Sequence, residues 1–262
     1  EVTGGSIVYD GQELLNLPEA EMLPLRGKRI SMIFQDPMTS LNPTQTVGDQ
    51  ILEVLNLHFP EMTREEKNKR VDEMMTLVGI PPQRKKSFPH EFSGGMKQRV
   101  VIAMALVAEP ELLLADEPTT ALDVTIQAQI LELMKQLREK FNTSVMLITH
   151  DLGVVAQFCD SVSVVYAGRV VEYGPVEIVF QRKENHPYTA GLFNCIPNLH
   201  DDQPRLHPIA GHMADPRVEY KGCCFADRCE YATERCRTEA PSMHVCGEHG
   251  ILCHRYAEKE EF

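Results

Sequence analysis

The sequence contains no apolar stretch long enough to cross a membrane as a helix. Its longest uninterrupted apolar run, residues 100–108, has nine residues, whereas a spanning helix needs roughly 20. It also lacks a charged start followed by an apolar segment and a small-residue cleavage site, so no secretory signal is visible. We therefore expect a soluble chain, and because Glu1 is not a natural initiator, a fragment of a longer protein.

Positive charge is also scarce. The chain has 26 basic against 38 acidic side chains, a formal net charge of -12, so a nucleic-acid backbone would be repelled unless basic residues gathered on one face. Nucleic acid is therefore not an expected partner. A chain of 262 residues with 43% apolar composition can bury one large core, and a smaller appendage is possible.

Cysteines are unevenly distributed. Six of the eight lie within residues 223–253. In a small secreted protein such crowding would indicate disulfides, but the rest of this chain is typical of a cytosolic enzyme. Local metal binding is the favoured interpretation.

The first half of the chain alternates short apolar runs with helical patterns. Residues 30–34 have the composition of a buried strand, and Thr63 opens a capping box whose helix ends near Gly79. Residues 42–110 are expected to be mainly helical, and residues 162–166 and 170–173 to form a hairpin.

A βαβ unit is predicted next to these segments. Residues 112–115 and 145–149 are apolar runs of buried-strand type, and between them Ile126, Ile130, Leu133, Leu137 and Phe141 share one helical face. A parallel sheet covered by helices is the natural architecture. After about residue 180 the composition shifts to Pro, His, Cys and charges without periodicity, which predicts a loop-rich appendage.

Two adjacent acids, Asp116 and Glu117, end the first strand of this unit. Ligands of parallel sheets bind beyond the carboxyl ends of strands. One acid could hold Mg2+ and its neighbour could deprotonate an attacking water. Alone, the pair could equally be two solvated acids in a turn.

A possible anion site lies at Ser93, Gly94 and Gly95, before a helix-compatible run. Serine can cap the helix, and glycines let backbone N–H groups approach a phosphate closely. Taken singly, an ordinary Ser-Gly-Gly loop is the commoner explanation. By the same reasoning Gln35 could be a surface residue and His150 a structural histidine.

In combination these segments resemble the ABC-transporter ATPase family. The matching segments are Gln35 (Q-loop), residues 92–96 (signature motif), residues 112–117 (Walker B strand), residues 121–123 (D-loop) and His150 (switch histidine). Phe92 and Met96 depart from the commonest signature, which has Leu and Gln there, but its Ser-Gly-Gly core is present.

The resemblance implies a role for each matched residue. Asp116 would organise Mg2+, Glu117 would be the general base and His150 would contact the terminal phosphate of ATP. Gln35 would link metal and water to the transporter interface. The nucleotide-binding set is implied to be Ser93, Gly94, Gly95 and Asp123, with the Ser-Gly-Gly segment touching the ATP held by the opposite subunit.

The family's phosphate loop, Gly-x-x-x-x-Gly-Lys-Ser/Thr, is absent from the sequence. The only Gly-Lys pair, Gly27-Lys28, is followed by Arg29 and has no glycine five positions earlier. In the family this loop precedes the Q-loop, so we expect truncation rather than degeneration, and we expect the chain alone to be inactive as an ATPase.

Two further segments, residues 32–43 and 186–189, resemble the dipeptide and oligopeptide importer branch, whose nickel-importing members are close.

Within this branch, the resemblance implies that four residues ligate an iron-sulfur cluster: Cys223, Cys229, Cys236 and Cys253. Thiolates are suitable ligands, and four are usual, as in a 4Fe-4S cluster. A zinc site built from the same thiols is the alternative. The same segment also contains Cys224 and Cys246, so the sequence alone does not decide which four of its six thiols are the ligands.

The sequence therefore predicts an α/β fold, a P-loop NTPase ABC-ATPase core with a helical subdomain and a Cys-rich, loop-rich C-terminal extension. The expected boundaries are residues 1–180 for the ATPase domain, with the helical subdomain at about 42–110, and residues 181–262 for the extension. The predicted function is ATP hydrolysis that energises dipeptide or oligopeptide uptake, with ATP and Mg2+ bound.

The expected partners are a second ABC ATPase subunit, two transmembrane permease subunits and an extracytoplasmic peptide-binding protein. The chain would act peripherally, at the cytoplasmic face of the cell membrane. Alternatives are nickel uptake, a non-transport ABC ATPase acting on ribosomes or DNA, and a metal or redox sensor centred on the cysteine-rich tail. Which peptide is carried, and whether the ATPase pair is identical, are not encoded in these motifs.

Overall fold

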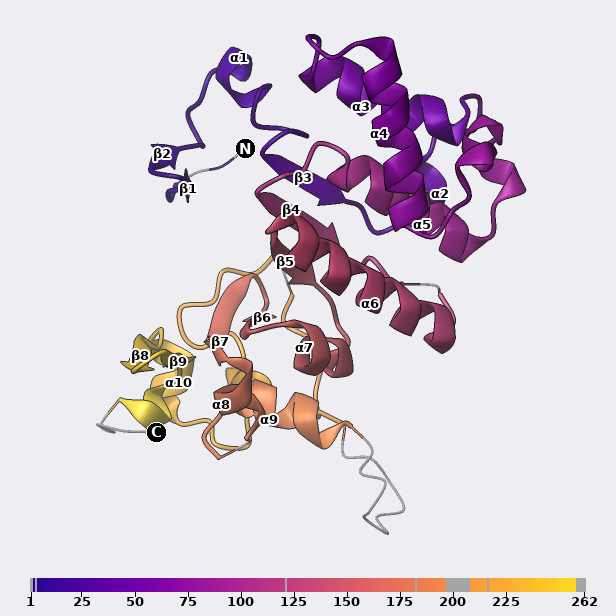
Figure 1. The fold of residues 1–262 in the computed structure, drawn as a ribbon. Helices are drawn as coiled ribbons and strands as arrows, with labels where there is room; N and C mark the ends of the chain where they lie inside the picture. The colour runs from indigo at the N-terminus through magenta and orange to yellow at the C-terminus, as the bar shows by residue number, and fades with distance from the viewer. Residues whose placement is uncertain are drawn as a thin grey trace. The chain divides into compact units, whose positions relative to one another are not determined.

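A computed structural model describes residues 2, 4–120, 122–181, 183–196, 208–215 and 217–257, apart from the side chain of Met38. The chain divides into two compact units, Glu1–His150 and Asp151–Phe262 (Figure 1). No helix in the described ranges combines the length and the apolar character that a membrane span requires.

The first unit is built on a parallel sheet. Its strands are β3 (Ile30–Ile33), β4 (Leu112–Asp116) and β5 (Ser144–Ile148), in the order β3-β4-β5. Helix α6 (Val124–Phe141) connects β4 to β5, so the predicted βαβ unit is confirmed. Parallel neighbours bring the carboxyl ends of all three strands to one edge of the sheet.

Helices and a small hairpin complete this unit. Its remaining elements are β1 (Val8–Tyr9), β2 (Gln12–Glu13), α1 (Glu19–Met22), α2 (Pro37–Ser40), α3 (Val47–His58), α4 (Arg64–Leu77), η1 (Pro82–Lys86), η2 (Pro89–Glu91) and α5 (Gly94–Leu106). The predicted capping box is present, because Thr63 accepts from the Glu66 amide and the Glu66 carboxylate accepts from the Thr63 amide.

The sheet buries only one of its faces among the described residues. Ile33, Leu113 and Ala115 are buried on the side where α5 packs against β3. On the other side a cross-strand row runs from Met32 through Leu114 to Met146, and the two methionines are 37% and 57% exposed.

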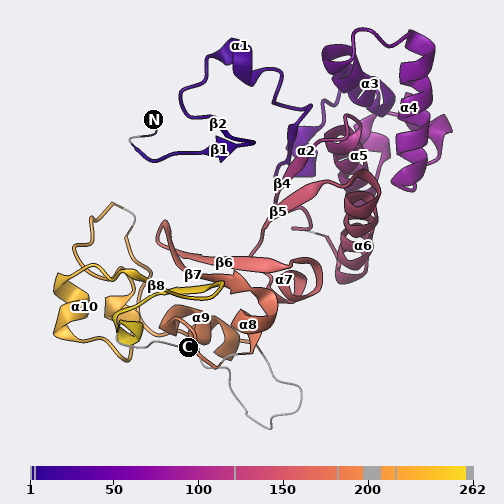
Figure 2. The same cartoon turned by 60° about the vertical axis from the view of Figure 1, so that its left-hand side comes forward.

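The second unit is built on an antiparallel sheet. Its strands are β6 (Ser161–Tyr166), β7 (Arg169–Pro175), β8 (Met243–Cys246) and β9 (His249–Leu252), in the order β6-β7-β9-β8. The β6–β7 hairpin was predicted, whereas the pairing of β9 with β7 was not (Figure 2). The unit's helices are α7 (Leu152–Phe158), α8 (Val176–Phe180), α9 (Pro187–Asn194), α10 (Glu234–Thr238), η3 (Ala226–Arg228) and η4 (His254–Tyr256).

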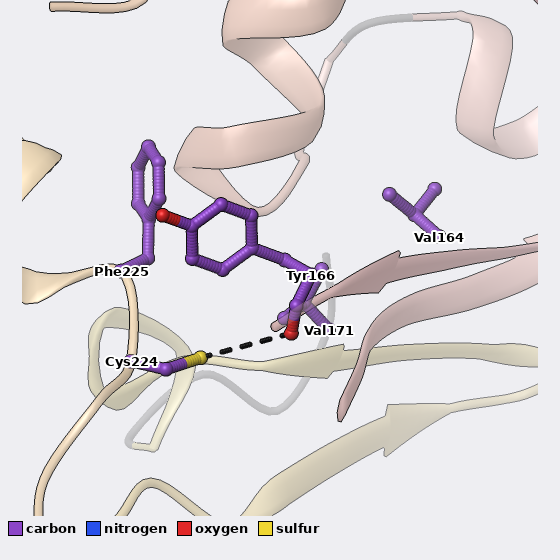
Figure 3. Close-up of a cluster of buried hydrophobic side chains, with 5 residues drawn as sticks. All are labelled: Val164, Tyr166, Val171, Cys224 and Phe225. Carbon is purple, nitrogen blue, oxygen red and sulfur yellow. Dashed lines mark hydrogen bonds between the residues drawn. The ribbon is translucent and has the colours of Figure 1, made fainter. Parts of the chain in front are cut away.

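An aromatic core joins the sheet to the cysteine-rich segment within this second unit. Val164, Tyr166 and Val171 of the hairpin form one buried cluster with Cys224 and Phe225. The rings of Tyr166 and Phe225 meet edge to face at 5.2 Å, and the Cys224 thiol lies 3.9 Å from the Tyr166 carbonyl oxygen (Figure 3). Edge-to-face pairs are favourable beyond their buried area, so this cluster anchors the segment that carries the cysteines.

Candidate functional site

Glu117 lies directly after β4, at a strained turn. Its φ of 43° is in the left-handed region, which is costly for a residue other than glycine. The turn is held by a hydrogen bond of 2.9 Å from the Glu117 amide to the Ile148 carbonyl at the end of β5. The backbone therefore fixes the direction in which the Glu117 carboxylate leaves the sheet edge.

Three side chains converge on this carboxylate. Gln35 Nε2, beyond the end of β3, donates to Glu117 Oε2 at 2.7 Å, and Thr120 Oγ1 donates to the same oxygen at 2.9 Å. His150 Nδ1, beyond the end of β5, lies 3.0 Å from Glu117 Oε1. The structure thus brings together Gln35, Glu117 and His150, the three residues predicted to be catalytic.

The same contacts set the charge of Glu117. Hydrogen bonds from His150, Thr120 and Gln35, in that order of size, lower the pKa of the Glu117 carboxyl. The group is therefore ionised at neutral pH, as a general base must be. Oε2 accepts from two donors, whereas the only side chain of the three that contacts Oε1 is His150, so Oε1 is the oxygen with room for a water. The His150 side chain is 76% exposed against 22% for Glu117.

Asp116 is the last residue of β4 and pairs in register with Ile148 of β5. It lies at the same strand edge as Glu117, so the two acids are adjacent as predicted. Asp123 begins α6 as its N-cap, and its Oδ1 accepts from the Ile126 amide at 3.0 Å. Ala121, in the predicted D-loop, lies outside the described residues.

Ser93, Gly94 and Gly95 form the N-terminus of α5, where the Ser93 hydroxyl accepts from the Met96 amide at 3.4 Å. The two glycines differ in their surroundings. A Cβ at position 95 would lie 2.6 Å from Ile126 Cγ2, whereas one at position 94 would have Leu122 at an ordinary 3.8 Å. Packing against α6 therefore requires glycine at 95, while position 94 leaves room for an approaching group.

Thr120 is a member of the cluster that the sequence analysis missed. It lies three residues after Glu117, and its backbone amide also donates to the Glu117 carbonyl at 3.1 Å. A threonine in a polar loop has no periodic signal. Its spacing of three residues from a strand-terminal acid, which suits a tight turn, could have indicated it.

The four cysteines predicted to ligate a cluster line one narrow pocket of the second unit. Cys223, Cys229, Cys236 and Cys253 meet there, whereas Cys224 and Cys246 do not line it. Gly222 allows this approach, since a Cβ there would collide with the Cys236 carbonyl oxygen. The Cys223 amide donates to that same oxygen at 2.8 Å.

Burial dominates the chemistry of these thiols. It raises the pKa of Cys223 to about 11, and it also raises the pKa of Cys229 and of Cys253. Without a metal, the thiols of Cys223, Cys229 and Cys253 are therefore neutral at pH 7, and a metal would have to displace their protons.

The donor set is four soft sulfur ligands, one buried and three partly buried, and it fits an iron-sulfur cluster chemically. The arrangement in the structure is tight, with free volume of about 20 Å³, room for about one water. Among the described residues, no group of three or more His, Cys, Asp or Glu side chains is arranged to hold a metal ion. Binding of any metal group would therefore require these side chains to rearrange.

Comparisons with known families match both units. The family described as ABC transporter matches residues 1–120, and the family described as oligopeptide/dipeptide transporter, C-terminal region, matches residues 171–236. These matches cover the sheet edge with Glu117 and most of the segment with the thiol pocket.

Individual relatives match over nearly the whole chain. The oligopeptide transport ATP-binding protein OppD of Haemophilus influenzae is 48% identical, over 98% of this chain and 79% of its own length. OppD of Salmonella typhimurium is 52% identical, over 91% and 71%. The dipeptide transport ATP-binding protein DppD of Bacillus subtilis is 50% identical, over 97% and 76%.

Solved structures of similar fold are also ATP-binding cassettes. A post-hydrolysis dimer of the cassette MJ0796 bound to ADP and Pi superposes with a TM-score of 0.60 and 30% identity, over 66% of this chain and 74% of that one. CbiO1 of Clostridium perfringens, part of an ABC transporter complex, gives 0.61 and 31%, over 70% of each chain.

Proposed function

The chain belongs to the ABC transporter ATP-binding family, in its oligopeptide and dipeptide branch, and we propose that Gln35, Glu117 and His150 form the hydrolytic side of its ATP site. It is an ATPase subunit of an importer for peptides. The fold is that of the P-loop ABC ATPases, as the sequence predicted.

The observation that carries this proposal is the convergence of three strand ends on one carboxylate. Glu117 is the general base, because it is ionised and its turn is fixed by β5. Gln35 and His150 hold the base when the site is empty. When ATP binds, His150 turns to donate to the terminal phosphate, and the attacking water takes its place as a donor to Glu117. Oε1 of Glu117 then accepts the proton of the water.

Mg2+ fits the oxygen donors at this edge. The Asp116 carboxylate is a hard ligand of the kind that Mg2+ prefers, and the amide oxygen of Gln35 is another. Bound there, Mg2+ would neutralise charge on the phosphates. Ser93, Gly94, Gly95 and Asp123 belong to the face that meets the ATP of the opposite subunit, where the α5 N-terminus offers backbone N–H groups.

The assembly follows from the family. A second ATPase subunit and membrane permease subunits are the partners of this chain. We further propose an extracytoplasmic peptide-binding protein as the supplier of substrate, and a peripheral location at the cytoplasmic face of the membrane. The identity of the permease and binding protein would then select the peptide.

A 4Fe-4S cluster in the thiol pocket is the second part of the proposal. It is supported by the four thiols that meet there and by the two remaining thiols, Cys224 and Cys246, which lie elsewhere. Bound there, the cluster would stabilise the fold of the extension and could accept an electron. If zinc were found bound to the same four thiols, the site would be a zinc site and the cluster assignment would be wrong.

The ATPase assignment is tested with a complete partner subunit that carries a phosphate loop. Each ATP site then takes its loop from one subunit and its Ser-Gly-Gly segment from the other. Because this sequence has no phosphate loop, the mixture has one working site at most, and that site uses Ser93 but not Glu117 from this chain. Ser93→Arg should abolish ATP turnover, while Glu117→Gln should leave it nearly unchanged.

Ser161→Arg, on the exposed side of β6, is the matched control and should leave turnover unchanged. If the phosphate loop is restored to this chain, Glu117→Gln should lower turnover at its own site by about 10²- to 10⁴-fold. Equal harm from Ser93→Arg and Glu117→Gln in the first mixture would show that the two residues do not serve opposite sites.

A further inference from the structure

The segment His186-Pro187-Tyr188-Thr189 is a branch motif that ATP chemistry does not explain. In the structure His186 is the N-cap of α9 and is 1% exposed. His186 and Pro187 line the thiol pocket together with the four cysteines. The ring of His186 also lies 5.8 Å from that of Phe225, two residues after Cys223. The first two residues of the motif are therefore part of the wall of the thiol pocket.

The backbone around His186 is fixed by a buried carboxylate. Glu172 of β7 is 0% exposed, and its Oε2 accepts from the His186 amide at 2.9 Å. Its Oε1 accepts from Asn185 Nδ2 at 2.7 Å and lies 2.9 Å from His249 Nε2. These contacts hold the histidine at the pocket wall regardless of what the pocket contains.

One hydrogen bond settles which nitrogen of His186 carries the proton. Nδ1 accepts from the Tyr188 amide at 3.1 Å, so Nδ1 has no hydrogen. Burial lowers the pKa of His186 to about 4, which keeps the ring neutral at physiological pH. A neutral imidazole has one N–H, and here it must be on Nε2. The hydrogen bonds that His186 makes among the residues described use its backbone groups and Nδ1, and none of them uses Nε2.

We propose that the His186 Nε2–H group donates a hydrogen bond to a sulfur of the metal group bound by the four cysteines. This inference rests on the proposed cluster. A donor placed beside metal-bound thiolate or sulfide compensates negative charge in a pocket shielded from water. It stabilises the reduced, more negative form of a cluster and therefore raises its reduction potential. His186 is a positioning and tuning residue here, not a ligand.

Two substitutions separate the capping role of His186 from its role as a donor. In His186→Asn the side-chain oxygen can still accept from the Tyr188 amide, but no group reaches as far as Nε2. In His186→Gln the longer amide can offer an N–H near the former Nε2 position. A structural role alone would make Asn the milder change, whereas a donor role would make Gln the milder one.

The experiment uses the 262-residue chain, reconstituted anaerobically with iron and sulfide. Iron content, thermal unfolding and the midpoint reduction potential are measured for the wild type and both variants. We expect His186→Asn to keep its fold, to have a lower potential than the wild type and to lose iron faster to a chelator. His186→Gln should fall closer to the wild type in both properties.

Two results would overturn the inference in distinguishable ways. A wild-type chain that binds no iron under these conditions removes the cluster, and the inference with it. A wild-type chain that binds iron while His186→Asn matches it in potential and in iron loss leaves the cluster standing and removes the donor. If His186→Asn fails to fold, a His186→Gln potential shifted well below the wild type would also contradict the proposal.

Discussion

Gln35 Nε2 donates a 2.7 Å hydrogen bond to Glu117 Oε2, which joins the segment after β3 to the turn after β4. In this contact the amide donates and the carboxylate accepts, so the bond favours the ionised form of Glu117. A change at Gln35 should therefore be detectable at Glu117 without any nucleotide present.

We expect Gln35→Leu to raise the pKa of Glu117 toward its usual value, with His150 and Thr120 maintaining part of the lowering. Because the folded pKa is depressed, the contact stabilises the fold above the usual carboxyl range and loses its effect as the pH falls through the folded pKa. The measurement is carbon-13 NMR titration of the Glu117 carboxyl. Gln136→Leu is the control, because Gln136 donates to Glu132 at 2.9 Å on an exposed helix face. A Glu117 pKa that is equal in both variants would contradict this reading of the contact.

The two glycines of the α5 N-terminus should respond differently to alanine. Gly95→Ala places a Cβ 2.6 Å from Ile126 Cγ2, so we expect the overpacking to cost about 1–3 kcal/mol of the free energy of unfolding. Gly94→Ala has ordinary contact distances and should be neutral or stabilising by up to about 1 kcal/mol. Urea unfolding measures both.

Ile126→Ala removes the methyl group that collides, so the double variant Gly95→Ala/Ile126→Ala should recover part of the cost when compared with Ile126→Ala alone. An equal loss of stability for Gly94→Ala and Gly95→Ala would mean that α5 packs on α6 differently from the structure.

Local patterns were enough to predict the parallel sheet of the first unit and two of its long helices, but not its short elements such as α1, α2 and η1. The capping box at Thr63, the apolar helix face from Ile126 to Phe141 and the runs ending at Asp116 are short-range signals, and each element formed where it was expected. The strand-end rule pointed to Asp116 and Glu117, whereas Gln35 and His150 were assigned to the site only by the resemblance to the ABC-transporter ATPases. Thr120 was not predicted as a site residue, because its contact with Glu117 depends on a turn and turns leave no periodic pattern in the sequence.

The second unit was predicted less completely because its order depends on distant partners. The contact of Glu172 with His249 joins positions 77 residues apart, and each strand of the β8–β9 hairpin has only four residues. In strands this short, an alternation of apolar and polar residues cannot be recognised in the sequence. The tail was therefore expected to be loop-rich, and its contribution to the β6–β7 sheet was not foreseen.

The thiol pocket predicts a difference between cysteines. Anaerobic purification should give a brown chain with about four irons if one cluster occupies the pocket. Cys229→Ser removes a pocket thiol and should eliminate the colour, whereas Cys246→Ser changes a thiol outside the pocket and should not. Iron analysis and visible absorption provide the readout. A colourless chain with stoichiometric zinc would establish the zinc alternative, and equal effects of both substitutions would contradict the choice of ligands.

The buried carboxylate of Glu172 should be critical for the second unit. Glutamine is nearly the same size but has one acceptor oxygen and one donor group. If its oxygen faces Asn185 and His249, its NH2 group faces the His186 amide, so two donors meet without an acceptor. The reverse orientation leaves Asn185 and His249 without their acceptor. Either way, Glu172→Gln should cost about 1–3 kcal/mol of the free energy of unfolding.

The matched control is Glu239→Gln, which breaks an exposed ion pair with Arg235 and should cost about 0–1 kcal/mol. Because Glu172 also positions the His186 amide at the pocket wall, its substitution should loosen the pocket as well as the sheet. Alkylation of Cys223 and Cys253 under native conditions should therefore become faster in Glu172→Gln but not in Glu239→Gln, as measured by mass spectrometry. Lower stability without faster alkylation would mean that Glu172 supports β7 and β9 alone, and that the wall of the thiol pocket is held by other contacts.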